Sequence, residues 1–284
     1  MVIEVTAEEL AREMLSDGHL SEAVGAIRRD GFVILNGVVA HEHLDVLREQ
    51  MTVDLELILK AEGVPHNFVK GHVRQDPPPF APFVFRDVVA NPWAVQVTKA
   101  VLGEGVFNRS CSGNANVPGT LLQPVHVDER HLWPNLAEAH PAAQLAVNIA
   151  LNDVTEENGS IELWPGSHLD THQVWGSDVK VDEGMVEDRR LVAPPVRGNT
   201  KKGSVLIRDM RLWHRGTPNV SDAPRFMLAM VHNCVWMHRL PRFQFVKGCE
   251  TAFENDDLDS HVEFVDGPID YLYRNKPYDY EDEH

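Results

Sequence analysis

The sequence has few cysteines, no long apolar run and too few basic residues to balance its acids. Its three cysteines, Cys111, Cys234 and Cys249, form no CxxC pair, which argues against a disulfide framework and a cysteine-rich zinc site. We expect them to be reduced and buried. No apolar stretch approaches the roughly 18 residues of a membrane span, and the first residues carry acids where a secretory signal has an apolar core. We therefore expect a cytoplasmic protein without a membrane partner.

The shortage of basic residues limits the partners that the chain can take. There are 26 Lys and Arg against 43 Asp and Glu, which gives a formal net charge of −17. Such a surface repels a phosphate backbone, so nucleic-acid binding is disfavoured and a small-molecule substrate is favoured. The sequence leaves open whether the chain is a monomer or a homodimer.

The first third of the chain is expected to be mainly helical. Across residues 41–61, apolar residues recur at steps of three and four and form one helix face, which should pack on a sheet. Three successive prolines make residues 77–83 an irregular connection. The other elements expected here are two helical segments within 7–29, a strand over 31–39 and a helix over about 91–102.

From residue 105 onward the pattern changes to short apolar runs separated by Gly, Pro, Asn and Asp. This pattern predicts a mainly β fold with flanking helices, as a sandwich or barrel. A long polar stretch at about 169–202 is expected to be a binding or lid loop. We expect one domain over 1–284, with a helical preface (1–104), a β core (105–240) and a C-terminal segment with an acidic tail (241–284). The expected strands include LLQPVHVD, GSVLIRD and RFMLAMVHNCVW.

A candidate metal site begins in the segment QPVHVDERHLW. His126 and Asp128 are two residues apart, so on an extended strand both side chains point to the same face. A third ligand is needed, and His214 in LWHRGTPN is the best candidate, because it follows a predicted strand and precedes a turn. Two imidazoles and one carboxylate form the facial triad that suits ferrous iron and leaves positions open for substrate and oxygen.

Arg225 lies eleven residues after His214, at the start of an apolar run. A returning strand can place its guanidinium inside the barrel. A buried arginine there needs an anionic partner, and its planar fork is suited to binding a carboxylate with two hydrogen bonds.

These motifs resemble the phytanoyl-CoA dioxygenase family of iron(II)- and 2-oxoglutarate-dependent oxygenases. The resemblance extends over about residues 20–240 and rests on HVD (126–128), LWPGSH (163–168), WHRGTPN (213–219) and Arg225, with an N-terminal segment at 28–51. It implies that His126, Asp128 and His214 bind Fe(2+), that Arg225 holds the far carboxylate of 2-oxoglutarate, and that O2 is a co-substrate. The implied fold is a double-stranded β-helix, a cupin-like jelly-roll barrel over 105–240 buttressed by helices.

Other residues are weaker candidates. Gln123 occupies a position from which related enzymes donate to the keto-acid end of 2-oxoglutarate. Asn148, a polar residue inside an apolar strand, is expected either to reach the cofactor or to satisfy a neighbouring backbone group. His131 and Trp133 are close enough to the HVD motif to line the substrate entrance, and Lys70 resembles basic residues at the pocket mouth of some relatives. The aromatic candidates for an apolar pocket are Trp133, Trp164, Trp175 and Phe245.

The oxidative outcome is only partly predicted. Related halogenases replace the triad carboxylate with Gly or Ala, so the presence of Asp128 indicates oxygenation, most simply hydroxylation of a C–H bond in a small organic molecule such as a natural-product intermediate. Desaturation, epimerisation, rearrangement and endoperoxidation on the same triad remain alternatives. A non-redox metal-binding barrel, acting as an isomerase or sensor, is a rival that has no need of Arg225.

Overall fold

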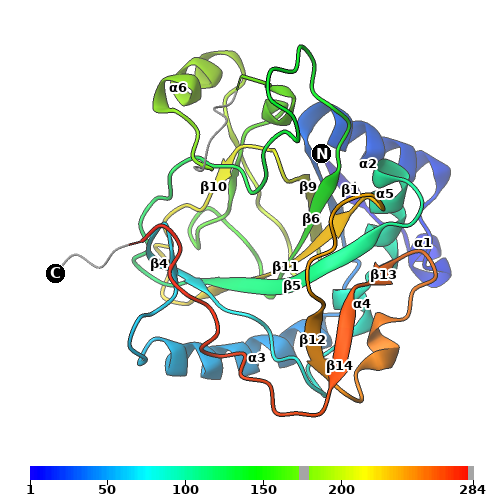
Figure 1. The fold of residues 1–284 in the computed structure, drawn as a ribbon, viewed down its shortest axis with the longest axis vertical. Helices are drawn as coiled ribbons and strands as arrows, with labels where there is room; N and C mark the ends of the chain where they lie inside the picture. Colours follow the sequence, from blue (N-terminus) through cyan, green and yellow to red (C-terminus); the bar gives the residue numbers. More distant parts are fainter. Residues whose placement is uncertain (173–178, 281–284) are drawn as a thin grey trace.

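The centre of the fold is a nine-stranded mixed sheet (Figure 1). The computed structural model describes residues 1–172 and 179–280. The strand order is β1-β2-β9-β6-β11-β5-β4-β3, and β13 pairs with β5. The bounds are β1 Val2–Glu4, β2 Phe32–Asn36, β3 His66–Asn67, β4 Val69–Arg74, β5 Phe107–Asn116, β6 Gln144–Ala150, β9 Val205–Asp209, β11 Arg225–Asn233 and β13 Asp259–Ser260.

Two smaller sheets accompany the large one. A three-stranded sheet has the order β10-β7-β8, and β12 pairs in parallel with β14. The first of these brings His214, the first residue of β10, opposite Leu163 of β7. The bounds are β7 Glu162–Leu163, β8 Val196–Arg197, β10 His214–Arg215, β12 Phe243–Val246 and β14 Val262–Val265.

Helices cover one face of the large sheet. Helices α2 and α5 contact β2, β9 and β6, and α3 lies beneath the sheet in the view of Figure 1. The starts of α2 and α5 are capped, because Ser16 and Asn91 each accept a hydrogen bond from the first turn. The bounds are α1 Ala7–Arg12, α2 Asp17–Asp30, α3 His41–Ile58, α4 Arg86–Val89, α5 Pro92–Leu102 and α6 Glu183–Val192, with 3-10 helices at Ser167–Leu169 and Glu250–Phe253.

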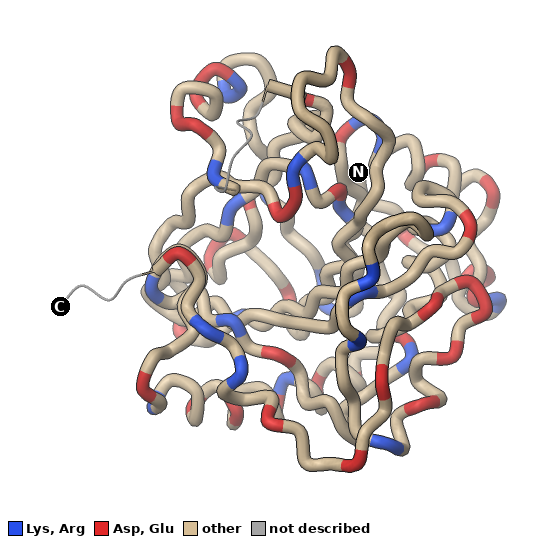
Figure 2. The backbone as a smooth tube through the Cα atoms, viewed as in Figure 1, with Lys and Arg blue, Asp and Glu red and all other residues tan. Residues whose placement is uncertain are grey.

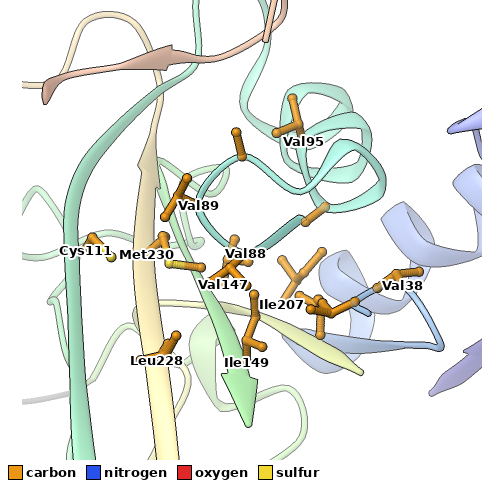
Figure 3. Packing of buried hydrophobic residues seen from close by; sticks show 14 of the residues in the cluster. Val38, Val88, Val89, Val95, Cys111, Val147, Ile149, Ile207, Leu228 and Met230 are labelled. Atoms are coloured by element: carbon orange, nitrogen blue, oxygen red, sulfur yellow. The ribbon is translucent and has the colours of Figure 1, made fainter. Parts of the chain in front are cut away.

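Alternation along the central strands separates the core from the opposite face. Val147, Ile207 and Leu228 belong to one large apolar cluster with the helices (Figure 3). Their neighbours Ala146 and Leu206 point to the other face. The large apolar core therefore lies between the sheet and the helices, and the opposite face carries smaller apolar clusters and leaves room for a site.

The structure bears out the expected helices and most strands, and it corrects two expectations. Residues 121–128 form no regular strand: only His126 pairs, as an isolated bridge, and Leu121 and Leu122 are exposed. Pro124, which has no N–H to donate, lies in the middle of this segment. The stretch 169–202, expected to be a loop, contains α6 and β8. Helix α6 is capped by Asp182, whose carboxylate accepts from the amides of Gly184 and Met185.

The cysteines behave as expected: all three are buried and unpaired. Within the described ranges, no helix combines the length and apolar character needed to cross a bilayer.

A buried histidine behind the sheet makes stability depend on pH. His232 lies 2.9 Å from the hydroxyl of Thr98, and burial lowers its pKa to about 3. Since its unfolded pKa is about 6.5, only the unfolded state takes up this proton between those values, and stability falls as the pH falls from 6.5 towards 3. At pH 5 the loss is about 2 kcal/mol. Urea unfolding at pH 7.5 and 5.0 measures this effect. The free energy of unfolding should fall less between these two pH values in His232→Gln than in the wild type.

The exposed residue His238 provides the control. His238→Gln should retain the wild-type difference between the two pH values. An unchanged difference in His232→Gln would contradict the assignment.

Candidate metal centre and its cavity

A cavity of about 420 Å³ lies on the face of the large sheet away from the helices. Its wall combines residues of β5, β6, β9 and β11 with His214 of β10. Small residues on the sheet floor, Ala146, Ala229 and Gly113, help to leave this space open. Elements that are far apart in the sequence therefore converge on one cavity.

His126, Asp128 and His214 meet in this cavity. One ligand atom of each lies within 4.8 Å of the others, and this is a group that could hold a metal ion. His126 and His214 sit directly opposite each other, with a backbone hydrogen bond of 2.9 Å in each direction. Their ring centroids are 4.3 Å apart. Backbone pairing thus positions the two imidazoles side by side.

Both imidazoles are oriented for coordination. The Nδ1 atoms of His126 and His214 each lie 2.9 Å from a backbone carbonyl, of Pro124 and Leu212. Donation from Nδ1 leaves the Nε2 lone pair free for an ion. Burial lowers the pKa of both histidines, that of His214 well below 6.5, so both rings are neutral ligands at neutral pH.

Asp128 is held by an arginine. Its side chain is 32% exposed because it faces the cavity, Oδ1 lies 3.7 Å from Nε2 of His214, and Oδ2 forms an ion pair with Arg208 of β9. Burial alone would raise the carboxyl pKa, but the charge and hydrogen bond of Arg208, together with the nearby His214 and His126, outweigh burial, and the pKa of Asp128 is lowered. The carboxylate is therefore ionised, with one oxygen fixed and the other directed towards the histidines.

Arg208 also contacts Asn148. Its Nε donates to Oδ1 of the Asn148 amide at 3.2 Å, and Asn148 lines the cavity. Asn148 thus holds a buried arginine from a place on the cavity wall, a contact that was not expected from the sequence. Its expected contact with the cofactor stays a prediction.

Arg225 enters the same cavity from the start of β11. It donates to Asn114 at 3.2 Å and to the carbonyl of Gly159 at 3.1 Å. Within the described residues it has no carboxylate partner, and its Nε has no hydrogen-bond partner. Burial lowers its pKa to about 10, so the guanidinium remains charged at neutral pH. A buried, unneutralised guanidinium is a site for an anion.

Gln123 and His72 form the wall beside this arginine. The amide of Gln123 donates to the Asn67 carbonyl at 2.9 Å and accepts from the amide of Gly216 at 2.8 Å. Its Nε2 therefore has one hydrogen left for a ligand. Burial, reinforced by the charge of Arg225, lowers the pKa of His72 to about 3, which keeps this imidazole neutral.

Three weaker candidates lie outside the cavity lining. Lys70 is exposed on β4. His131 is buried elsewhere, with Nε2 3.0 Å from the carbonyl of Asp170 and Nδ1 3.3 Å from Arg211. Trp133 is 52% exposed and packs against His140. Closeness to the HVD motif in sequence did not bring His131 and Trp133 into the cavity, because the chain turns away after Asp128.

The aromatic candidates also lie elsewhere. Trp164 and Phe245 are buried in apolar clusters that do not line the cavity, and Trp175 lies outside the described residues. Among described residues, the only aromatic rings on the cavity wall are those of histidines.

The C-terminal segment closes over one metal-ligand candidate. Tyr278 exchanges backbone hydrogen bonds of 2.9 Å with His66 and Phe68. The ring of Phe68 packs at 4.5 Å from that of His126, and Tyr278 packs on Phe68. Asp279 forms an ion pair with Lys180, which is bridged to His126. Residues 278–279 and Lys180 therefore meet beside His126.

Sequence reasoning missed three arginines of the cavity, Arg74, Arg109 and Arg208. Arg208 carried a signal, because an arginine in the otherwise apolar strand VLIRD needs a buried partner. Arg109 carried none, because a bulge in β5 decides which way it points.

The sequence matches the model of one protein family and is similar to known dioxygenases. The model of the family described as "Phytanoyl-CoA dioxygenase (PhyH)" matches residues 27–227. The chain is 25% identical over 243 residues to an ectoine dioxygenase of Bordetella bronchiseptica, covering 77% of this chain and 76% of that protein. It is 28% identical over 140 residues to dioxygenase af480 of Aspergillus fumigatus, covering 49% of this chain but only 40% of that protein.

A solved structure has a similar fold. The epimerase SnoN, determined in complex with Fe3+, alpha ketoglutarate and nogalamycin RO, superposes with a TM-score of 0.59 at 18% identity, covering 77% of this chain and 85% of that one. The family match extends over most of the chain and includes the HVD motif, His214 and Arg225. The chain therefore belongs to the phytanoyl-CoA dioxygenase family of iron(II)- and 2-oxoglutarate-dependent oxygenases.

Proposed function

We propose that this dioxygenase hydroxylates an unactivated C–H bond of a small organic molecule, such as a natural-product intermediate. The observation that carries the proposal is the convergence of His126, Asp128 and His214 within 4.8 Å, in a cavity that also contains Arg225. Iron(II), 2-oxoglutarate and O2 supply the oxidising chemistry when bound, and the protein supplies binding and orientation.

The donor set fits iron(II). Two neutral imidazoles and one ionised carboxylate form the facial triad that leaves positions open for co-substrate and oxygen. The rings of His126 and His214 are oriented by contacts of Nδ1 with backbone carbonyls. Arg208 holds Oδ2 of Asp128 in an ion pair. Partners of this kind keep a ligand in one orientation and tune its basicity.

The unpartnered charge of Arg225 fits 2-oxoglutarate. In the proposal its guanidinium binds the far carboxylate, and the remaining amide hydrogen of Gln123 is directed to the co-substrate. Asn148 contributes through Arg208. Lys70, His131 and Trp133 receive no role at the substrate, because they lie outside the cavity lining.

Asp128 favours hydroxylation over halogenation, because the carboxylate occupies the position that a halide would need. Desaturation, epimerisation, rearrangement and endoperoxidation can start from the same abstraction of hydrogen and remain alternatives. A non-redox metal barrel is disfavoured, since it would have no use for a buried arginine without a carboxylate partner.

We also propose that the nine- and three-stranded sheets are the two halves of a jelly-roll barrel, and that residues 1–284 form one oxygenase domain. The cavity supports this arrangement, because both sheets contribute to its wall. The solved neighbour with a TM-score of 0.59 covers 77% of the chain.

Anaerobic titration of the iron(II)-loaded protein with 2-oxoglutarate tests the proposal. We expect a weak visible charge-transfer band in the wild type, and at least about 100-fold weaker 2-oxoglutarate affinity in Arg225→Ala, because two charge-assisted hydrogen bonds are lost. Arg74→Ala is the matched control, since Arg74 lines the same cavity and should leave the band in place. Iron bound without a band in the wild type would instead support the non-redox barrel.

A further inference from the structure

The cavity has the opposite charge balance to the chain. The chain carries a formal charge of −17, and Figure 2 shows Asp and Glu spread around the whole fold. The lining nevertheless includes Arg74, Arg109, Arg208 and Arg225 but a single carboxylate, Asp128. A cationic cleft in an acidic protein concentrates anions locally.

The arginines divide between two ends of the cavity floor. Arg225 begins β11, and six residues further along the same strand lies Val231, about 20 Å away. Val231 pairs with Ala146, which pairs with Arg208 of β9. Arg208 therefore lies at the opposite end of the floor from Arg225. In the proposed function, 2-oxoglutarate binds at the Arg225 end.

A bulge brings Arg109 to this second end. In β5, Cys111 pairs with Met230 and Asn108 with His232, so two residues, Arg109 and Ser110, stand opposite Val231. Without the extra residue, Arg109 would point to the helix side. Bulges next to active sites commonly redirect a side chain in this way. As a result Arg109 lines the cavity, across Val231 and Ala146 from Arg208.

The two arginines are held but not saturated. Consecutive acids orient them: Asp128 binds Arg208, and Glu129 binds Arg109 at 2.9 Å. The Nη1 of Arg208 has no hydrogen-bond partner within the described chain. The Arg109–Glu129 pair has side chains 20% and 37% exposed, so it is only weakly stabilised and can rearrange around a ligand.

Charge pairing leaves the cavity as a whole with an excess of positive charge. A divalent ion would balance the two charges of 2-oxoglutarate, and Asp128 and Glu129 balance Arg208 and Arg109. The charge of Arg225 then remains uncompensated in the cavity, together with that of Arg74, which forms no ion pair with a carboxylate within the described residues. One more anion in the cavity is therefore electrostatically favourable, and the Nη1 of Arg208, which has no partner within the described residues, is a donor available to it.

We propose that the organic substrate carries an anionic group, a carboxylate or phosphate monoester, which Arg109 and Arg208 bind above Ala146 and Val231. The proposal rests on the proposed function, because it assumes that 2-oxoglutarate occupies the Arg225 end. It makes Arg109 a specificity-determining residue. The absence of aromatic rings other than histidine from the described wall agrees with a polar substrate.

Calorimetric titration of the anaerobic iron(II) protein saturated with 2-oxoglutarate tests this inference. The probes are benzoate and indole-3-acetate, their primary amides of matched shape, and phenyl phosphate. We expect the acids to bind at least about tenfold more tightly than the amides. A further increase in the 2-oxoglutarate concentration should leave the affinity of the acids unchanged, because they bind at the other end of the cavity. The comparison of benzoate with phenyl phosphate distinguishes the two anionic groups.

Arg109→Gln should abolish the preference for acids, and Arg109→Lys should retain part of it. Arg74→Gln removes the same charge from the same cavity beside Asn114, and should leave the preference intact. Equal binding of acids and amides, no measurable binding of the acids, or loss of the preference in Arg74→Gln instead of Arg109→Gln would each overturn the inference. Failure of 2-oxoglutarate itself to bind would contradict the proposed function instead.

Discussion

Asp128→Gly should reduce succinate release from 2-oxoglutarate by more than about 100-fold, because removal of a ligand costs more than the 10- to 100-fold typical of its outer-shell partners. Iron(II) binding should weaken in parallel. The same substitution leaves Arg208 buried without its carboxylate, so the metal-free variant should also lose about 1–3 kcal/mol of stability. Turnover, iron affinity and thermal unfolding of the metal-free protein measure the three effects.

Asp222→Gly is the control for this experiment, since it removes an exposed carboxylate of the loop before β11. It should preserve both turnover and iron affinity. Full turnover by Asp128→Gly would show that the wrong carboxylate had been assigned to the metal.

Gly159→Ala should destabilise the protein by about 3 kcal/mol or more. Gly159 has φ +81°, and an added Cβ would lie 2.2 Å from Nδ2 of Asn116 and 2.6 Å from the carbonyl of Thr217. The left-handed backbone costs a non-glycine residue about 1–2 kcal/mol, and crowding in a packed region adds about 1–3 kcal/mol. Since the Gly159 carbonyl accepts from Arg225, 2-oxoglutarate affinity should fall as well.

Gly119→Ala separates the two contributions. Gly119 has φ +80°, but a Cβ there would meet nothing within 4 Å. Chemical denaturation should therefore show only the backbone cost for Gly119→Ala, with 2-oxoglutarate binding unchanged. Equal losses of stability in both variants would mean that crowding at Gly159 is relieved by movement of its neighbours.

Local patterns predicted the helices, because caps and apolar periodicity are encoded within each segment. Helix α3 shows this: its buried face includes Leu44, Leu47, Met51, Leu55 and Ile58, the residues whose spacing predicted it. Strand pairing was less accessible to sequence. Residues 121–128 look like a strand, but they are organised by single bridges to distant residues.

The site likewise contains residues that local sequence predicts and contacts that depend on strand pairing. His126, Asp128, His214 and Arg225 were named from spacing and from the family resemblance, and the structure brings all four to one cavity. Other residues of the cavity wall depend on strand register. Arg109 faces the cavity only because of a bulge. Such contacts are decided by pairing between strands that are distant in sequence, so the sequence of one strand does not predict them.

The pairing of Tyr278 with Phe68 has a consequence for the order of events in synthesis. Phe68 and His126 emerge from the ribosome long before Tyr278, which packs on Phe68 over the ring of His126. A nascent chain that already contains every residue of the triad still lacks this cover. The packing beside the metal centre is therefore completed only after the C-terminal segment has been synthesised.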